Sequence, residues 1–115
     1  MEQDMNVEQV TPDAALSLLA GGAALIDVRE LEEWQVGRAP QAVHIPLGQL
    51  ASELVSLPND RKLIVVCRSG GRSNRAAAAL VAHGLPAVNL AGGMQAWQAA
   101  ALPVVADEGV PGQVA

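Results

Sequence analysis

Aromatic residues are almost absent from this sequence, which has two tryptophans and neither phenylalanine nor tyrosine. Half of its 115 residues are nevertheless hydrophobic, so the core must be built from Leu, Val, Ile and Ala. A chain of this length can form one compact domain with a substantial core, but it is too short for two. We therefore expect a single domain in which small side chains let helices pack closely against a sheet.

Basic residues are also scarce, with seven Lys and Arg against twelve Asp and Glu and a formal net charge of −5. A nucleic-acid surface needs clustered cations to neutralise phosphates, and the overall charge argues against one. The N-terminus is acidic and polar, unlike a signal peptide, and no apolar run approaches membrane-spanning length. We therefore expect a cytoplasmic protein with neither a nucleic-acid nor a membrane partner.

The chain has only one cysteine, Cys67. A single thiol excludes an internal disulfide, a Cys-X-X-Cys redox pair and a cysteine-based zinc site. The two histidines, His44 and His83, are widely separated in the sequence and do not make a metal cluster. The sequence therefore predicts no metal and no cofactor, and the thiol must act alone or with an outside partner.

Short apolar runs alternate with helical segments along the chain. Continuous apolar runs fit strands that are buried on both faces of a parallel sheet, and their alternation with helices is typical of an α/β layer sandwich. The expected strands are 23–28, 43–45, 63–66 and 87–90, and the expected helices are 12–20, 31–36, a segment within 46–57, 73–83 and 94–100. We expect one domain over residues 1–104, with its core from about residue 7, and a flexible tail over 105–115, which lacks periodicity.

Cys67 stands where the apolar run 62–66 gives way to a loop rich in Gly and Arg, followed by an alanine-rich helix. A buried strand brings its last side chain to the edge of the sheet. The following helix points its free N–H groups and the positive end of its dipole back toward that residue. Such a thiol should ionise easily, and the thiolate is the nucleophilic form of cysteine. The segment predicts nucleophilic sulfur chemistry on an anionic substrate.

Three of the seven basic residues follow Cys67 within eight positions, at Arg68, Arg72 and Arg75. Arginine at a helix N-terminus opposes the dipole, so stability alone does not explain this cluster. Adjacent glycines allow the loop to curl, and several backbone N–H groups can then converge above the sulfur as an anion-binding nest. The expected catalytic residue is Cys67. The expected substrate-binding residues are Arg68, Ser69, Gly70, Gly71, Arg72 and Ser73.

A cysteine phosphatase is the obvious competing interpretation. Its signature places an arginine at the sixth residue after the cysteine, where this chain has Ser73. The loop in this chain is one residue shorter than a phosphatase loop. It would crowd a phosphoryl ester but could hold a sulfur atom bonded to the thiol. A phosphatase or an arsenate reductase remains an alternative that a phosphoester assay would detect.

Four segments together resemble the single-domain rhodaneses, a family of sulfurtransferases. The resemblance covers roughly residues 7–104 and implies a three-layer α/β sandwich, in which a five-stranded parallel sheet has helices on both faces. The segment 37–42 departs from the pattern Gly-His-Ile-x-Gly-Ala that relatives usually show, which leaves substrate and acceptor preference open. The matching segments are Leu25-Ile26-Asp27-Val28-Arg29 with Glu33-Trp34 and Gly37, Ala42-Val43-His44-Ile45-Pro46, Cys67-Arg68-Ser69-Gly70-Gly71-Arg72-Ser73, and Gly92-Gly93-Met94 with Trp97 and Leu102-Pro103-Val104.

The resemblance implies transfer of sulfane sulfur from thiosulfate, or a similar small anionic donor, through a persulfide on Cys67. The acceptor would be cyanide, an external thiol or a thiol-bearing protein. The backbone N–H groups of 68–73 would hold the persulfide, and Arg72, with Arg68 as a second candidate, would hold the oxyanion. Two further readings stay open: a persulfide carrier loaded by a partner protein, and a non-catalytic module, which the retained cysteine disfavours.

The remaining polar and aromatic residues are expected to be structural. In the family, Asp27 and Arg29 brace the loop, and we expect them to form ion pairs or hydrogen bonds without taking part in the chemistry. Arg75 is expected to be solvated. His44 and His83 are also expected to be structural, and the core is expected to include Trp34 and Trp97.

Overall fold

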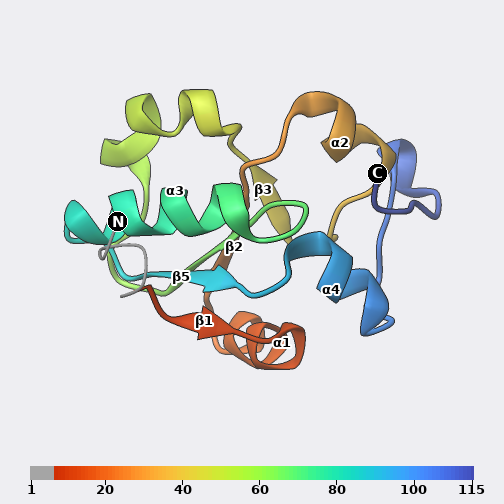
Figure 1. Ribbon diagram of the computed structural model, residues 1–115, viewed down its shortest axis with the longest axis horizontal. Coiled ribbons are helices and arrows are strands. Elements are labelled where there is room, and N and C mark those ends of the chain that lie inside the picture. Colours follow the sequence, from red (N-terminus) through yellow and green to blue (C-terminus); the bar gives the residue numbers. More distant parts are fainter. Residues whose placement is uncertain (1–6) are drawn as a thin grey trace.

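The computed structural model describes residues 7–115, which form one five-stranded sheet flanked by helices (Figure 1). Every strand pair is parallel and the order across the sheet is β1-β5-β4-β2-β3. The expected fold class is therefore confirmed. The strands are β1 (Gln9–Val10), β2 (Ala24–Asp27), β3 (Ala42–His44), β4 (Leu63–Val66) and β5 (Ala87–Leu90).

Helices lie on both faces of this sheet (Figure 1). The first helix begins as expected, because the side chain of Thr11 accepts a hydrogen bond from the backbone N–H of Ala14 at 3.1 Å and Pro12 occupies the first turn. Within residues 7–115, no helix is long and apolar enough to cross a bilayer. The helices are α1 (Pro12–Ala20), α2 (Leu31–Val36), α3 (Gly71–Ala82) and α4 (Gly93–Ala99), and the 3₁₀ segments are η2 (Leu47–Gln49), η3 (Ala51–Ser56) and η4 (Asp107–Gly109).

The central strand β4 divides the core into two clusters. Leu63 and Val65 point to the face covered by α3 and the 3₁₀ segments, while Ile64 and Val66 point to the face covered by α1 and α4. All four side chains are inaccessible to solvent. Burial on both faces explains why the strand is a continuous apolar run. Cys67 follows directly after the last residue of this strand.

Two expected helices differ from those observed. The segment within 46–57 forms 3₁₀ turns, in which the hydroxyls of Ser52 and Ser56 bond the carbonyls three residues earlier, at 2.9 Å each. Such side-chain bonds compete with α-helical pairing of the backbone. Helix α3 starts at Gly71, two residues earlier than expected, because Gly70 adopts a left-handed conformation (φ 112°) and acts as the N-cap.

Trp97 is fully buried, as expected, but the expectation for Trp34 was wrong. Trp34 is half-buried on α2, a six-residue helix with no fully buried residue. Its ring stacks on His44 with centroids 4.6 Å apart, and the guanidinium carbon of Arg38 lies 4.6 Å from its centroid. The Trp34 ring therefore packs against His44 and Arg38 and does not enter the core.

The segment 105–115 makes contacts that its lack of periodicity gave no reason to expect. Val105 and Arg38 exchange two backbone hydrogen bonds of 2.9 Å, and the N–H of Gln113 donates to the carbonyl of Val36 at 3.1 Å. The N–H of Val114 donates to Oε1 of Gln98 at 2.7 Å. The segment therefore lies against the loop 37–42, where the sequence departs from the family pattern.

Candidate active site

Cys67 follows the last residue of β4 at the carboxyl edge of the sheet, and only 1% of its surface is exposed. Its sulfur is nevertheless surrounded by donors, as the loop length led us to expect. The backbone N–H of Gly70 lies 3.1 Å from Sγ and the hydroxyl oxygen of Ser73 lies 3.2 Å from it. The loop after Cys67 curls around the thiol, and α3 begins at Gly71.

The pKa of the Cys67 thiol reflects two opposing effects. Burial raises the pKa because it disfavours the thiolate. Hydrogen bonds from the Ser73 side chain and from the backbone N–H groups of Ser73, Gly70 and Ser69 lower it. The lowering effects outweigh burial, and the net pKa is below the ordinary value for cysteine. The site therefore favours sulfur as an anion.

Backbone hydrogen bonds connect helix α4 to the loop that starts at Cys67. The N–H of Met94 donates to the carbonyl of Cys67 at 2.7 Å, and the N–H of Gln95 donates to the carbonyl of Arg68 at 3.0 Å. Gly93, just before them, has φ 61°, and a Cβ there would lie 2.5 Å from the Cys67 carbonyl oxygen. Only glycine fits this close approach. The first two loop carbonyls are thus tied to α4.

Ser73 connects the thiol to a polar network that the sequence analysis missed. Its hydroxyl lies 2.6 Å from Oδ1 of Asn89, on β5, and Nδ2 of Asn89 donates to Oε1 of Gln9, on β1, at 2.8 Å. Nε2 of Gln9 in turn donates to Oδ1 of Asn74 at 2.7 Å. The available signal was Asn89 itself, a polar residue in an otherwise apolar strand.

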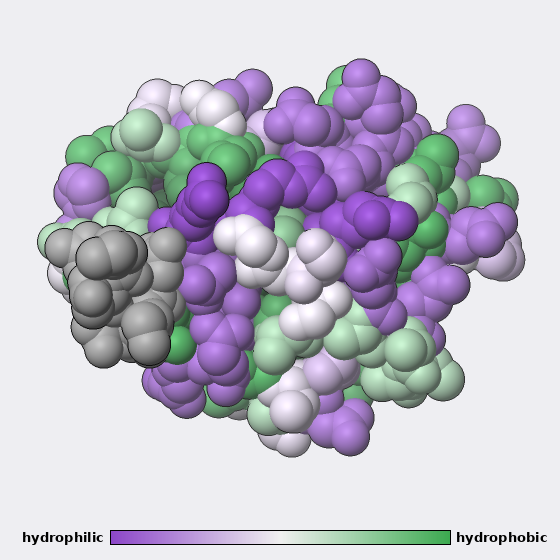
Figure 2. Space-filling model, viewed as in Figure 1, coloured by the Kyte–Doolittle hydropathy of each residue, from purple (hydrophilic) through white to green (hydrophobic). Residues whose placement is uncertain are grey.

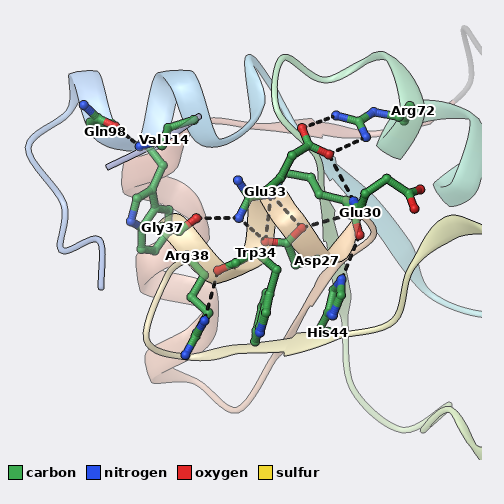
Figure 3. Close-up of polar contacts among 12 residues, drawn as sticks. Asp27, Glu30, Glu33, Trp34, Gly37, Arg38, His44, Arg72, Gln98 and Val114 are labelled. Carbon is green, nitrogen blue, oxygen red and sulfur yellow. Dashed lines mark hydrogen bonds and ion pairs between the residues drawn. The ribbon is translucent and has the colours of Figure 1, made fainter. Parts of the chain in front are cut away.

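The three arginines near the loop have different surroundings. Arg72 makes a bidentate ion pair with Glu33 of α2, with both N–O distances 2.8 Å (Figure 3). Its hydrogen bonds hold the pKa of Glu33 at about 2, well below the ordinary range. Nε of Arg68 donates to the carbonyl of Ala115 at 2.5 Å. Arg75 is exposed and has no hydrogen-bond or ion-pair partner among residues 7–115.

A cavity of about 380 Å³ lies beside the loop. It is lined by Leu47, Ser69, Gly71, Arg72 and Arg75. The structure thus gathers two loop residues and two arginines around this cavity, and Cys67 is not among the residues that line it. It leaves Arg68 directed at the tail.

Asp27 and Arg29 form an ion pair, as expected. Both side chains are inaccessible to solvent, and two parallel hydrogen bonds of 2.9 and 2.8 Å join them. Asp27 is labelled in Figure 3. Nη2 of Arg29 also donates to the carbonyl of Gly37 at 2.7 Å, and its own carbonyl lies 2.7 Å from Nε2 of His44. These bonds connect β2 to α2 and β3, and the His44 ring takes part in them.

The family model of the rhodanese-like domain matches residues 11–100. The chain belongs to the rhodanese family. It is 40% identical to a sulfurtransferase of Allochromatium vinosum over 86 residues, covering 74% of this chain and 80% of that one. It is 34% identical to the thiosulfate sulfurtransferase GlpE of Pseudomonas savastanoi over 93 residues, covering 80% and 88%. The crystal structure of a rhodanese-related protein from Thermoplasma volcanium has a TM-score of 0.80 at 30% identity, covering 85% and 97%.

The site of this rhodanese is equipped for covalent chemistry at sulfur. At least four donors stabilise a negative charge on the Cys67 sulfur, and no imidazole in the described part of the chain is hydrogen-bonded to it. Across residues 7–115, no group of three or more His, Cys, Asp and Glu side chains is arranged to hold a metal ion. The arrangement can therefore hold a sulfur anion without a general base.

Proposed function

We propose that this protein is a sulfurtransferase that carries sulfane sulfur on Cys67 as a persulfide. The observation that carries the proposal is the convergence of Gly70 N–H and the Ser73 hydroxyl on Sγ, at 3.1 and 3.2 Å. Such donors stabilise a thiolate, and the same donors suit the persulfide anion that replaces it. The relatives named as sulfurtransferases support this reading.

The donor proposed here is thiosulfate or a similar small anion. The Cys67 thiolate attacks the outer sulfur, a new S–S bond forms, and the bond between the two sulfurs of thiosulfate breaks. Sulfite leaves with the electron pair of that bond, and Cys67 becomes a persulfide. Cyanide or a thiol then attacks the outer sulfur of the persulfide and takes it away as thiocyanate or as a new persulfide. The Cys67 thiolate is regenerated, and no proton transfer is required with thiosulfate and cyanide.

The surroundings of Arg72 disfavour the phosphatase alternative. A phosphatase arginine must be available to grip phosphoryl oxygens, whereas Glu33 already holds the Arg72 guanidinium by two hydrogen bonds of 2.8 Å. A phosphoryl group would have to displace this carboxylate. The shorter loop and the ion pair of Arg72 with Glu33 thus both argue against a phosphatase.

The test is to incubate the purified protein with thiosulfate and measure its intact mass. We expect the mass of one sulfur atom to be added to the wild-type protein, and no addition to Cys67→Ser. Cyanide should then remove the added mass and release thiocyanate. Ser52→Ala, an exposed change on η3, serves as a control that should be loaded like the wild type.

Two results would redirect the assignment. Thiocyanate production by Cys67→Ser would overturn the role of the thiol. A wild-type protein that thiosulfate never loads, but that a persulfide-bearing protein does load, would be a carrier and not a thiosulfate-using enzyme.

A further inference from the structure

Residues 112–115, which we call the strap, connect α2 to α4 beside the thiol loop. The N–H of Gln113 donates to the carbonyl of Val36, the last residue of α2, at 3.1 Å. The N–H of Val114 donates to Oε1 of Gln98, on α4, at 2.7 Å (Figure 3). The backbone of the strap is therefore held at two helices from distant parts of the sequence.

Glycine on both sides allows the strap to lie close to α2. A Cβ on Gly37 would overlap the carbonyl of Gln113, and a Cβ on Gly112 would lie 2.7 Å from the carbonyl oxygen of Val36. These neighbours are backbone atoms, which cannot turn aside as a flexible side chain could. The chain thus has glycine at both points where the strap and the end of α2 meet, which indicates that their contact is specific.

The strap reaches Arg68, the residue that follows Cys67. Nε of Arg68 donates to the carbonyl of Ala115 at 2.5 Å. Both residues are exposed and line a cavity of about 350 Å³ beside α4, so neither is fixed by the core. The N–H of Gln95 holds the carbonyl of Arg68 at 3.0 Å, so the backbone can stay in place while the side chain changes rotamer. Because consecutive Cα atoms are about 3.8 Å apart, the long Arg68 side chain can turn to the strap or to the loop around Cys67.

Arg68 is held less firmly than Arg72. Two hydrogen bonds join the Arg72 guanidinium to the Glu33 carboxylate, whereas Arg68 donates one bond to a neutral carbonyl. A bidentate guanidinium–carboxylate pair is the stronger arrangement. An incoming anion therefore displaces the Ala115 carbonyl from Arg68 more readily than it displaces Glu33 from Arg72. Figure 2 shows that strongly hydrophilic surface covers the start of α3 and extends toward the C-terminal end of the chain, which Figure 1 places at the right.

We propose that the strap is an autoinhibitory contact that holds the Arg68 guanidinium away from the thiol loop, and that Gln98 positions the strap. When the strap lifts, Arg68 turns to the loop and binds the anionic sulfur donor. This inference rests on the proposed sulfur transfer, because it concerns how the donor is bound before Cys67 attacks it. Since the donor and the strap compete for one guanidinium, each weakens the binding of the other.

Gln98→Ala tests the proposal by removing the acceptor of the Val114 N–H. Loosening the strap raises the fraction of protein in which Arg68 is available to the donor. The KM for thiosulfate, measured as thiocyanate release with cyanide, should fall about two- to fivefold while kcat is unchanged, because an exposed contact of this kind is weak. The difference from the wild type should shrink as sodium chloride is added, since it depends on an exposed cation.

Two matched variants separate the strap from a general effect of mutation. Gln98→Glu keeps an oxygen that can accept the Val114 N–H, so KM should not fall. Gln113→Ala changes an exposed side chain of the strap that has no hydrogen-bond partner among residues 7–115, and its backbone bond to Val36 is retained. Its KM should equal that of the wild type. Equal KM values in Gln98→Ala and Gln113→Ala would overturn the proposal.

Amide hydrogen exchange tests the strap without turnover. In Cys67→Ser, saturating thiosulfate should speed exchange of the Val114 N–H when compared with sodium chloride at the same ionic strength. The N–H of Ala100, which donates to the carbonyl of Ala96 at 3.0 Å, is the internal reference and should not change. Unchanged exchange at Val114 would overturn the strap, even in a protein that thiosulfate loads. Faster exchange, with a wild-type protein that is never loaded, would retain the strap and overturn the proposed function.

Discussion

The hydroxyl oxygen of Ser73 lies 2.6 Å from Oδ1 of Asn89, closer than its 3.2 Å separation from Sγ of Cys67. A hydroxyl has one proton to donate, so the amide oxygen and the sulfur compete for it. Asn89 is fixed as an acceptor because its own NH₂ group donates to Gln9 at 2.8 Å. The Asn89–Gln9 pair therefore influences how well Ser73 stabilises the thiolate.

Removing the hydroxyl should raise the pKa of the Cys67 thiol. Ser73→Ala deletes a hydrogen bond that lowers this pKa and leaves burial, which raises it. Hydrogen bonds to charged groups contribute about 1.5 kcal/mol or more, so persulfide formation at neutral pH should slow roughly tenfold. The thiolate absorbance titrated against pH should move to higher pH. An unchanged titration would show that the backbone N–H groups suffice.

Removing the competing acceptor should have the opposite effect. In Asn89→Ala, the Ser73 hydroxyl loses its nearer partner and can donate to Sγ. The pKa of the thiol should fall, and the same titration should move to lower pH. The variant should also unfold more easily, by about 1–3 kcal/mol, because the buried Asn89 amide and its hydrogen bonds to Ser73 and Gln9 are lost. A shift to higher pH would mean that Asn89 supports the Ser73 hydrogen bond and does not compete with it.

The Glu33–Arg72 pair should stabilise the fold in a defined pH range. The pKa of Glu33 is lowered from 4.5 to about 2, chiefly by its hydrogen bonds from Arg72. A carboxylate with a lowered folded-state pKa stabilises the protein above pH 4.5, and this contribution is lost as the pH falls toward 2. Because the Arg72 side chain is 37% exposed, solvent screening reduces the contribution to about 1–2 kcal/mol.

Glu33→Gln tests this pair because glutamine can still accept the Glu30 N–H bond that Glu33 accepts at 3.0 Å. We expect a lower free energy of unfolding at pH 7 and a weaker fall in stability below pH 4.5, measured by urea titration. The released Arg72 should also lower KM for thiosulfate severalfold, since an uncompensated cation then faces the cavity. Glu32→Gln, exposed on the same helix, is the control and should change none of these. A KM equal to that of the wild type would place Arg72 outside donor binding.

The sequence was sufficient for the layer architecture and for the nucleophile, because both depend on local order along the chain. The apolar run 63–66, followed by a glycine-rich loop, is typical of a buried strand, and the residue after such a strand lies at the edge of the sheet. The partners of the loop could not be predicted in the same way. Glu33 lies 39 residues from Arg72, and Gln9 lies 80 residues from Asn89. Such pairs form because α2 and β1 are brought beside the loop by the whole sheet.

The sequence also provided no basis for distinguishing the three arginines after Cys67 from one another. Clustering after Cys67 indicated a shared role in anion binding, yet Glu33 engages Arg72 and the tail engages Arg68. Spacing along the sequence cannot distinguish Arg68 and Arg72 from Arg75, for which only a solvated role was expected. Their difference is set by which acceptor lies within reach, and acceptors from distant segments are visible only in three dimensions.

Gly93 gives the last prediction, because it determines how closely α4 approaches the thiol loop. A Cβ at this position would lie 2.5 Å from the Cys67 carbonyl oxygen and 2.6 Å from the Arg68 carbonyl carbon. Both are backbone atoms, so Gly93→Ala must move the loop or α4. We expect stability to fall by about 2–4 kcal/mol and persulfide formation to slow at least tenfold in protein that is still folded, because the donors no longer converge on Sγ.

Gly84→Ala separates this packing effect from backbone strain. Gly84 also has a left-handed φ, 83°, but a Cβ there would have no neighbouring atom within 4 Å. Alanine at this position should cost about 1 kcal/mol of stability through strain alone and leave the rate of persulfide formation unchanged. Stability is measured by urea unfolding and loading by intact mass over time. Equal loading rates in the two variants would mean that the position of α4 does not control the geometry of the loop, and that the loop alone holds its N–H groups on the sulfur.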